Sequence, residues 1–427
     1  MDYTIMASTM FGIESITADE LRKLGYEDLT VENGKVSFVG DEMDIAICNV
    51  HLRTAERVLI KVAEFEARTF DELFDKTKEV EWGEYIPIHG KMHVTGKSVK
   101  STLFSVSDCQ AIVKKAVIEG MKRKYHKNEY PENGPVYKIE VAIMKDKVTL
   151  TIDTTGDGLH KRGYREYAGG APLKETLAAA MILISRWKPD RTLVDLFTGS
   201  GTIPIEAAMI ARNMAPGMNR SFVSETWPQF KNGEYKQVKE GAKAQIDYEK
   251  EVRILASDID GHILKTARPN AIKAGVGPDI EFHTMPANEF SSKKLTGTII
   301  TNPPYGERMG EIEEIRKIYK DLGKLSKKLP YWSMYVITSY EDFEDCFGEK
   351  ATKNRKLYNG TLKCYLYQYI RKFTDKDREL VDKEKEAKKE VKENVKKAKE
   401  ITKKYNEQKK IQKENNPFEK FIKKGRR

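Results

Sequence analysis

Apolar and polar positions follow two different rhythms along this chain of 427 residues. From about residue 190 to residue 370, short apolar runs of strand length alternate with stretches that carry apolar residues at helical spacing. Strands that alternate with helices form βαβ units around a mainly parallel sheet, so this half predicts a doubly wound α/β domain. The expected strands are residues 192–197, 253–259, 296–302, 333–339 and 362–370, and the segment with KLYNG before the last of them is expected to turn back antiparallel.

The first 155 residues have a different pattern, with short alternating strands and few helices. Such a pattern predicts an α+β region, which we expect to form two small lobes. The expected strands are residues 3–8, 35–40, 57–65, 91–98, 136–144 and 147–153, and the expected helices are residues 12–25, 41–52 and 105–125.

The strand expected at 296–302 is followed at once by two prolines in the stretch TNPPYG. Proline has no backbone N–H to donate to a sheet, so the strand has to stop at Asn302. This places Asn302 and Tyr305 at the carboxyl end of a strand, the edge at which open α/β sheets bind ligands. The alternative is a turn that only terminates the strand.

The length and composition fit a globular protein of two or three domains, because 427 residues exceed what one core normally supports. No apolar stretch approaches the roughly 18 to 20 residues of a membrane span, and the N-terminus lacks the pattern of a signal peptide. We therefore expect a cytoplasmic protein. Its four cysteines are scattered, which argues against a disulfide framework and a zinc site, and no metal is expected.

The net charge of +10 is concentrated at the C-terminus. Residues 376–427 contain 20 Lys and Arg against 11 Asp and Glu, which leaves the preceding residues almost balanced. Such a Lys/Glu-rich tail is typical of a solvated helix or a disordered extension, and it could also serve as a basic arm for a polyanion. RNA binding by the body of the protein would then depend on local basic patches.

The stretch DLFTGSGT ends a predicted strand and opens a predicted helix. Gly199 and Gly201 allow a tight turn and close approach to a ligand, although a glycine turn without a ligand is an alternative. A nicotinamide site would need a third glycine where this chain has Pro204, and a P-loop would need a Lys that is missing. The residues expected to contact a cofactor here are Asp195, Phe197, Thr198, Gly199, Ser200 and Gly201.

The next predicted strand ends in ASDID. An ionised carboxylate accepts hydrogen bonds from two donors at once, so Asp258 can bind both hydroxyls of a ribose, with Ile259 beside it. Asp260 lies further from the strand end and is expected to cap the following helix. A ribose-binding acid without a pyrophosphate loop indicates a nucleoside cofactor that lacks phosphates, and S-adenosylmethionine fits.

Asn302 and its neighbours suit methyl transfer to an exocyclic amine of a base. The nitrogen lone pair of such an amine is partly delocalised into the ring, and two acceptors on its two N–H groups would turn it toward a sulfonium methyl. The side-chain oxygen of Asn302 is one acceptor and the carbonyl of Pro303 is the other, while Tyr305 can stack on the base.

DLFTGSGTIPIEAA, SDIDGHILKTARPNA and TNPPYGER together resemble the class I methyltransferase core of the bacterial THUMP-domain RNA guanine-N2 methyltransferases, in their shorter Gram-positive form. The resemblance extends to residues 154–180 and covers the chain to about residue 370. It implies a ferredoxin-like lobe at residues 1–60, a THUMP RNA-binding domain at 61–155 and a methyltransferase domain at 156–375, before the tail at 376–427.

Two departures from the family pattern stand out. An Asp that often meets the cofactor adenine after the third strand is replaced by the stretch PAN, so adenine recognition is expected from Asn288 or from backbone. The large enterobacterial members continue into a second methyltransferase domain, whereas this chain continues into its Lys/Glu tail, so one modification is expected.

The stretch HKRGYR mixes basic and aromatic side chains, a combination suited to phosphate and stacking contacts with RNA. On composition alone an exposed linker is an equal alternative, and the resemblance favours RNA binding. The residues expected to contact RNA are Lys161, Arg162, Tyr164 and Arg165.

The function expected from this resemblance is N2-methylation of a guanosine in 23S rRNA by a monomeric, S-adenosylmethionine-dependent enzyme. One alternative keeps the chemistry and takes tRNA as the substrate. Another is a non-catalytic RNA-binding or assembly factor that retains a cofactor pocket. DNA adenine methylation is a third, which an N-terminal THUMP-like region disfavours.

Overall fold

The computed structural model describes residues 1–166, 172–305 and 312–371, together with seven single positions between 379 and 407. Met1–Ser291 and Gly297–Ile370 form one compact unit. The predictions for the C-terminal tail therefore lie almost entirely outside the described residues.

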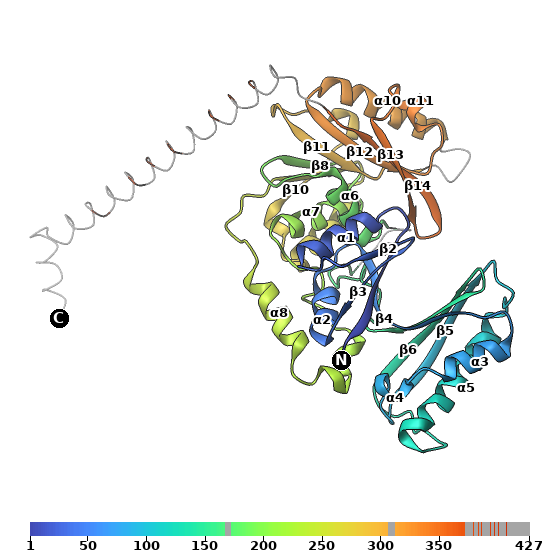
Figure 1. Cartoon of the computed structure of the whole chain (residues 1–427). Helices are drawn as coiled ribbons and strands as arrows, with labels where there is room; N and C mark the ends of the chain where they lie inside the picture. The colour runs from blue at the N-terminus through green and yellow to red at the C-terminus, as the bar shows by residue number, and fades with distance from the viewer. Residues whose placement is uncertain are drawn as a thin grey trace, which may run out of the picture. The chain divides into compact units, whose positions relative to one another are not determined.

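The N-terminal sheet has seven strands in the order β2-β3-β1-β4-β7-β6-β5. Strands β2 to β6 are labelled in Figure 1. All of its pairings are antiparallel except that of β5 with β6. The six strands expected from the alternation are confirmed, and a short β2 is added. Their bounds are β1 Tyr3–Thr9, β2 Thr30–Glu32, β3 Lys35–Gly40, β4 Ala55–Glu66, β5 Lys91–Val99, β6 Val136–Met144 and β7 Lys147–Asp153.

Strand β4 connects the two parts of this sheet, because it pairs with β1 on one side and with β7 on the other. Its twelve residues include the position between 60 and 61 at which the first domain limit was expected. The two expected lobes therefore share one continuous sheet.

Five helices accompany the N-terminal sheet, and the three that the sequence predicted are confirmed. Helix α2 begins where Asp41 accepts hydrogen bonds from the backbone N–H groups of Met43 and Asp44 at 2.8 and 3.1 Å, an N-cap that offsets unpaired donors of the first turn. The bounds are α1 Glu14–Lys23, α2 Glu42–His51, α3 Phe70–Lys78, α4 Trp82–Tyr85 and α5 Val106–Tyr125.

The C-terminal sheet also has seven strands, in the order β10-β9-β8-β11-β12-β14-β13. Every residue of the central strand β11 is buried, as expected for a parallel strand covered on both faces. The bounds are β8 Thr192–Asp195, β9 Ile254–Asp258, β10 Ile280–Thr284, β11 Gly297–Thr301, β12 Trp332–Thr338, β13 Lys353–Asn359 and β14 Leu362–Tyr369.

The predicted doubly wound sheet is confirmed, with one difference at its edge. Strands β10, β9, β8, β11 and β12 are parallel, and β14 pairs antiparallel with β12. Strand β13, which contains the expected antiparallel segment, lies outside β14 and pairs with β14. The last strand is therefore inserted between β12 and β13.

The helices of this half are α6 Glu175–Ser185, α7 Thr202–Ala211, α8 Glu234–Ala244, α9 Gly261–Lys273, α10 Ile312–Lys328 and α11 Phe343–Phe347. Helix α10 buries Ile315, Tyr319, Leu322 and Leu325, which recur every three or four residues and form one apolar face. Among the described residues, none of the helices combines the length and apolar character needed to cross a membrane.

A buried polar cluster connects the N-terminal half of the described unit with the C-terminal half. The side chain of Asn49, in α2, donates to Thr154 and to the hydroxyl of Tyr235, in α8, each at 2.9 Å. The backbone also approaches closely at Gly217, where an added Cβ would lie 2.6 Å from the carbonyl oxygen of Asn49. These contacts hold the two halves of the described unit together.

Candidate active site

The candidate site lies at the carboxyl ends of β8, β9 and β11. Strand β8 has β9 on one side and β11 on the other, so the chain order reverses at β8. In doubly wound sheets ligands bind at this switch point, outside the carboxyl ends of the strands. Asp195, Asp258 and Thr301 end these three strands, and Asn302 follows directly.

The glycine turn after β8 has the backbone conformation that its sequence predicts. Gly199 and Gly201 have φ values of +52° and +91°, in the region that glycine adopts without steric cost. A side chain at Gly201 would crowd Ile205 and Ala267 at 3.2 and 3.3 Å, whereas the space beside Gly199 is open. The turn therefore leaves room for a ligand at Gly199 and packs closely against the helices at Gly201.

Asp195 is a buried acid with one oxygen in use. Its Oδ1 accepts a hydrogen bond from the Thr301 hydroxyl at 2.7 Å, and its Oδ2 has no partner among the described residues. Burial disfavours the charged form and raises the pKa of Asp195 to about 7, although the Thr301 bond acts in the opposite direction. An unpaired buried carboxylate oxygen beside a cavity is a site for a donor or a cation.

Asp258 is held in place by two backbone N–H groups. Its Oδ2 accepts from Gly199 at 2.9 Å and its Oδ1 accepts from Asp260 at 3.0 Å. A carboxylate has about four acceptor positions, so both oxygens can accept further donors. The Asp260 side chain instead accepts from the N–H of His262 at 2.8 Å and caps α9, which confirms the cap expected there.

The NPPY segment places its asparagine and tyrosine in contact. The hydroxyl of Tyr305 donates to Oδ1 of Asn302 at 2.5 Å. The carbonyl of Pro304 accepts from the hydroxyl of Tyr319 at 3.0 Å, which anchors the segment to α10. Burial, with a smaller effect of Cys364, raises the pKa of the Tyr305 hydroxyl well above its usual value.

A cavity of about 350 Å³ brings most of these residues together. Eight residues expected to bind the cofactor or the target base line it: Asp195, Phe197, Thr198, Gly199, Ser200, Asp258, Ile259 and Asn302. It also includes residues that sequence reasoning missed: Pro172, Leu173, Thr202, Ile203, Ile263, Pro304 and Ile318.

Four of the residues expected to bind the cofactor or the target base do not line this cavity. Gly201 forms the turn behind it, and Asn288 is exposed on the 3-10 turn Ala287–Glu289. Pro303 is buried, and Tyr305 is half-buried with its hydroxyl on Asn302. Any role of Asn288, Pro303 or Tyr305 in binding stays a prediction.

Thr301 is a further residue that the sequence analysis missed. Its hydroxyl accepts from the N–H of Leu196 at 3.3 Å while it donates to Asp195. It thereby couples the ends of β8 and β11. A polar residue as the last member of an apolar strand, directly before Asn302, was the available signal.

The structure corrects the RNA contacts expected for Arg162 and Tyr164, because both side chains are buried with 4% exposure. The guanidinium of Arg162 forms an ion pair with Glu206 of α7 at 3.4 Å, and the hydroxyl of Tyr164 donates to the same carboxylate at 3.2 Å. Neither can contact a phosphate or stack on a base in this arrangement. Both residues instead attach the HKRGYR segment to α7.

The other two residues of the segment are more accessible. Lys161 is exposed and pairs with Asp157 at 2.9 Å. Arg165 donates to the hydroxyl of Thr202, at the start of α7, at 2.7 Å and pairs with Glu175 at 3.0 Å. Lys161 and Arg165 therefore remain candidates for contact with an anion.

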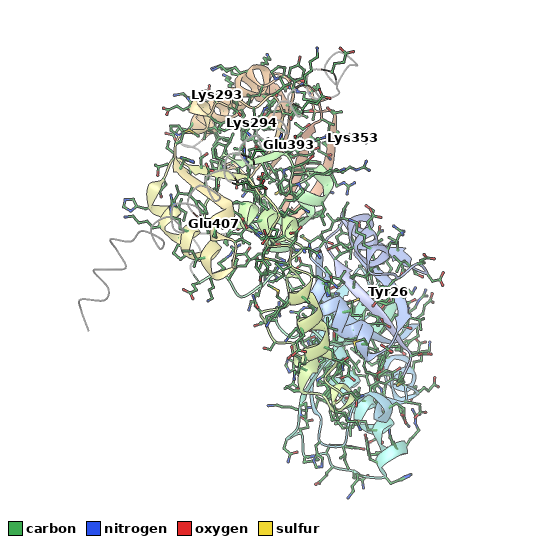
Figure 2. The ribbon with its side chains drawn as sticks, turned by 90° about the vertical axis from the view of Figure 1, so that its left-hand side faces the viewer. Tyr26, Lys293, Lys294, Lys353, Glu393 and Glu407 are labelled. Atoms are coloured by element: carbon green, nitrogen blue, oxygen red, sulfur yellow. The ribbon has the colours of Figure 1, made fainter. Side chains whose placement is uncertain are left out.

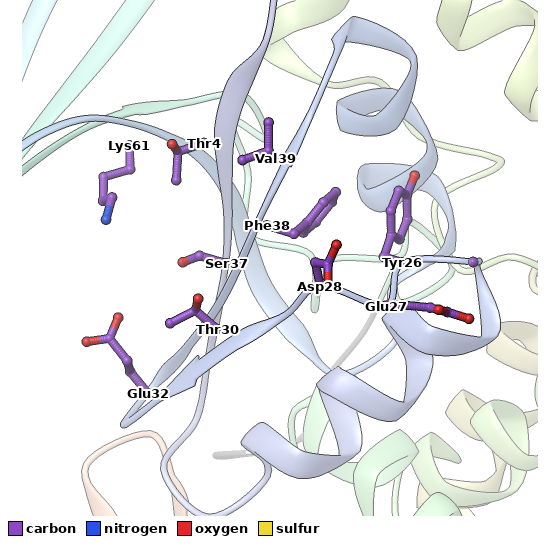
Figure 3. A pocket seen from close by; sticks show the side chains of 11 residues that line it. Thr4, Tyr26, Glu27, Asp28, Thr30, Glu32, Ser37, Phe38, Val39 and Lys61 are labelled. Atoms are coloured by element: carbon purple, nitrogen blue, oxygen red, sulfur yellow. The ribbon is translucent and has the colours of Figure 1, made fainter.

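A separate cavity of about 450 Å³ lies on the N-terminal sheet (Figure 3). Tyr26, which is marked in Figure 2, packs against Phe38 with ring centroids 4.3 Å apart, and both line the cavity. The charged residues that line this cavity are Glu27, Asp28, Glu32 and Lys61. None of the expected site residues lines it.

Comparison with known protein families identifies three domains. A model described as "RMKL-like, methyltransferase domain" matches residues 162–368, the part that contains the candidate site. An "RlmL ferredoxin-like domain" matches residues 4–59, and a THUMP domain matches residues 67–153. The ferredoxin-like, THUMP and methyltransferase architecture expected from the sequence is thus confirmed.

Two curated relatives align along most of the chain. A Bacillus subtilis (strain 168) protein named as an RNA methyltransferase, YpsC, is 49% identical over 372 residues, which cover 87% of this chain and 96% of the relative. The ribosomal RNA large subunit methyltransferase K/L of Syntrophotalea carbinolica is 33% identical over 379 residues. That alignment covers 84% of this chain, which spans about half (52%) of the longer relative.

Two solved structures share the fold and much of the sequence. SMU.472, which is named as a methyltransferase and is complexed with SAH, is 42% identical with a TM-score of 0.82, and the match covers 88% of this chain and 99% of that one. A Listeria monocytogenes protein named as an N6-adenine-specific DNA methylase is 48% identical with a TM-score of 0.82, over 87% and 97%. The C-terminal sheet therefore has the fold of S-adenosylmethionine-dependent methyltransferases, and the chain belongs to the RMKL-like methyltransferase family with ferredoxin-like and THUMP domains.

Proposed function

We propose that this protein transfers a methyl group from S-adenosylmethionine to the exocyclic N2 amine of a guanosine in RNA, and that the RNA is 23S rRNA. The observation that carries the proposal is the position of Asn302. It lines the same cavity as Asp195 and Asp258, at the carboxyl ends of neighbouring strands. An amide oxygen and a nucleoside-binding acid thus share one cavity.

The residues of the cavity fit the cofactor. The unpaired Oδ2 of Asp195 can accept from the cationic methionine end, and Asp258 keeps acceptor capacity for the two ribose hydroxyls. The open side of Gly199 leaves room for the ligand to approach the backbone. When bound, S-adenosylmethionine supplies a methyl group on a positively charged sulfur.

Asn302 and Pro303 act on the acceptor amine. The Asn302 oxygen accepts one N–H of the amine and the Pro303 carbonyl accepts the other, which turns the nitrogen lone pair out of conjugation with the ring. This interaction strengthens as positive charge develops on the nitrogen, so it favours the transition state over the bound substrate. Proton loss after transfer needs no strong general base.

The choice of guanosine in 23S rRNA is supported by the relative named as a ribosomal RNA large subunit methyltransferase and by the THUMP match. The Listeria protein's name points to a different amine, the N6 of adenine in DNA. Both amines could meet the same pair of acceptors. The experiment therefore tests DNA as well as RNA.

The decisive experiment compares RNA from wild-type and deletion strains of the source organism. We expect one N2-methylguanosine to be lost from 23S rRNA, and purified protein with S-adenosylmethionine to restore it. Loss of this nucleoside from tRNA alone would favour the tRNA alternative. Methylation of DNA adenine without any change in RNA, or the absence of transfer to any nucleic acid, would contradict the proposal.

A further inference from the structure

The largest of the three cavities described here has a volume of about 760 Å³ and is separate from the cofactor cavity. It is formed by the segment around residues 157–165, by the residues before α6 and by Asn219, Arg220 and Ser221. Its basic lining residues are Lys161, Arg162, Arg165, Lys174 and Arg220, and its acidic ones are Asp157 and Glu175.

Four of the five basic residues already have acidic partners. Lys161 pairs with Asp157, Arg165 with Glu175, Arg162 with Glu206 and Lys174 with Glu56, at distances of 2.9, 3.0, 3.4 and 2.9 Å. Arg220 is the exception, because it pairs with no carboxylate among the described residues. The cavity therefore has an excess of one positive charge, located at Arg220.

Arg220 is held by neutral groups only. Its Nη1 donates to the carbonyls of Gly158 and Lys161 at 2.7 and 2.9 Å, and its Nη2 donates to the carbonyl of Asp157 at 2.5 Å. Its guanidinium carbon lies 5.0 Å from the ring centroid of Phe222. These bonds fix the side chain and use three of its five N–H donors, so two donors have no partner among the described residues.

The surroundings of Arg220 disfavour its positive charge. Burial, together with the nearby charge of Arg162, lowers the pKa of Arg220 to about 10. A group in this state gains from any anion that reaches it. Asn219 and Ser221, on either side, are exposed polar residues that line the same cavity and can donate further hydrogen bonds.

We propose that this cavity binds a backbone phosphate of the RNA substrate, with Arg220 as the charged ligand and Asn219 and Ser221 as neutral donors. A guanidinium presents pairs of N–H groups whose spacing matches two oxygens of a phosphate. The inference rests on the proposed function, because it takes RNA as the substrate, and it adds a binding site to it.

The position of the cavity suits a phosphate close to the target nucleotide. Pro172 and Leu173 line both this cavity and the cofactor cavity. Arg165 lines the basic cavity and bonds the hydroxyl of Thr202, which lines the cofactor cavity. A phosphate bound at Arg220 would therefore lie in a cavity that adjoins the cofactor cavity, where it could position the strand that carries the target base.

The experiment places a negative charge at the rim without changing the size of a side chain. Asn219→Asp adds one charge beside Arg220, and Gln245→Glu adds one charge at an exposed position after α8, outside all three cavities. Binding of a fluorescein-labelled single-stranded RNA oligonucleotide is measured across a salt series. We expect Asn219→Asp to weaken binding about tenfold and to reduce the slope of log affinity against log salt by about 0.7, the value for one phosphate contact.

The control Gln245→Glu should change RNA affinity less than about twofold. Arg220→Gln should match the effect of Asn219→Asp, with cofactor affinity as the check of its folding. If Arg220→Gln fails to fold, the RNA affinity and salt slope of Asn219→Asp test the proposal on their own. Equal RNA affinity and slope for wild type and Asn219→Asp would overturn the proposal, as would equal effects of both acidic substitutions.

A further measurement tests whether inorganic phosphate stabilises the protein against thermal unfolding. If Asn219→Asp abolished thermal stabilisation of the protein by inorganic phosphate but left RNA binding unchanged, the cavity would be a site for a free anion and the proposal would be wrong. RNA affinity is measured without methyl transfer. The result is therefore independent of whether the guanosine chemistry proposed above is correct.

Discussion

Tyr305 donates its hydroxyl hydrogen to the side-chain oxygen of Asn302 at 2.5 Å, so one of the two lone pairs of the acceptor proposed for the target amine is already in use. A base that enters the site can donate its amine hydrogen to the other lone pair. The tyrosine then holds the Asn302 side chain in place before and after the substrate arrives.

This relationship predicts effects of different size on the methylation rate for two substitutions. Asn302→Ala should lower the single-turnover rate of RNA methylation by roughly 100- to 1,000-fold, the scale for one lost preorganised polar contact. Tyr305→Phe removes the hydrogen bond to Asn302 but keeps the acceptor, and its rate should stay within about tenfold of wild type, the scale of one ordinary hydrogen bond. A near-normal rate for Asn302→Ala would show that the NPPY segment is only a turn.

Asp258 and Asp260 form a matched pair for the cofactor site. Asp258→Asn should weaken S-adenosylmethionine binding by roughly 1.5 to 3 kcal/mol, because an ionised acceptor of two hydroxyls is lost. Asp260→Asn removes the same charge two residues away, and Asn caps a helix as well as Asp, so cofactor affinity should hardly change. Isothermal titration calorimetry measures both, and equal losses would place the ribose elsewhere.

Asp195 should make the stability of the cofactor-free protein depend on pH. Its pKa rises from 3.8 to about 7 on folding, so the folded state holds its proton more tightly than the unfolded state. The resulting stabilisation is fully present below about pH 4 and is lost as the pH rises through about 7. Asp195→Asn, which cannot ionise, should therefore be more stable than wild type at pH 8, by up to about 4 kcal/mol, since the pKa difference is about three units and one unit is worth about 1.36 kcal/mol.

The same substitution should weaken cofactor binding, because the unpaired acceptor Oδ2 becomes an amide nitrogen. Urea unfolding at pH 5 and pH 8, with and without S-adenosylmethionine, separates the two effects. A variant with the same pH dependence as wild type would show that Asp195 does not titrate in this range.

Arg162 should act through stability and not through RNA contact. Arg162→Met leaves the buried carboxylate of Glu206 unpaired and should cost about 3 to 5 kcal/mol in the free energy of unfolding. The neighbouring substitution Lys161→Met, at an exposed position, should change it by less than about 0.5 kcal/mol. Chemical denaturation tests this, and similar values for both variants would contradict the buried role of Arg162.

Much of the site could be predicted because its residues follow recognisable strands. Asp195, Asp258 and Asn302 each come directly after or at the end of an apolar run, and parallel strands bring such ends to one edge.

Helix α3 was missed although Thr69 and Glu72 have the spacing of a capped N-terminus, and the Thr69 hydroxyl accepts from the N–H of Glu72 at 3.2 Å.

The burial of Arg162 and Tyr164 could not be predicted from their own segment. Their shared partner, Glu206, follows more than 40 residues later in the apolar helix TIPIEAAMIA. An acid among buried apolar positions requires a partner, which was the available signal, but the sequence does not show which cation supplies it. The exposed position of Asn288 likewise depends on the path of the chain after β10, which the sequence does not show.

Strand β4 limits how the N-terminal half can be exchanged between relatives. Its residues Ala55–Glu66 cross the junction between the ferredoxin-like and THUMP matches, which end at residue 59 and begin at residue 67. A chimera joined inside this strand would combine two half-strands in one register, and a slip of one residue would turn its buried side chains outward. The two domains match separate family models but share one sheet, so a chimera that preserves folding has to transfer residues 1–153 together.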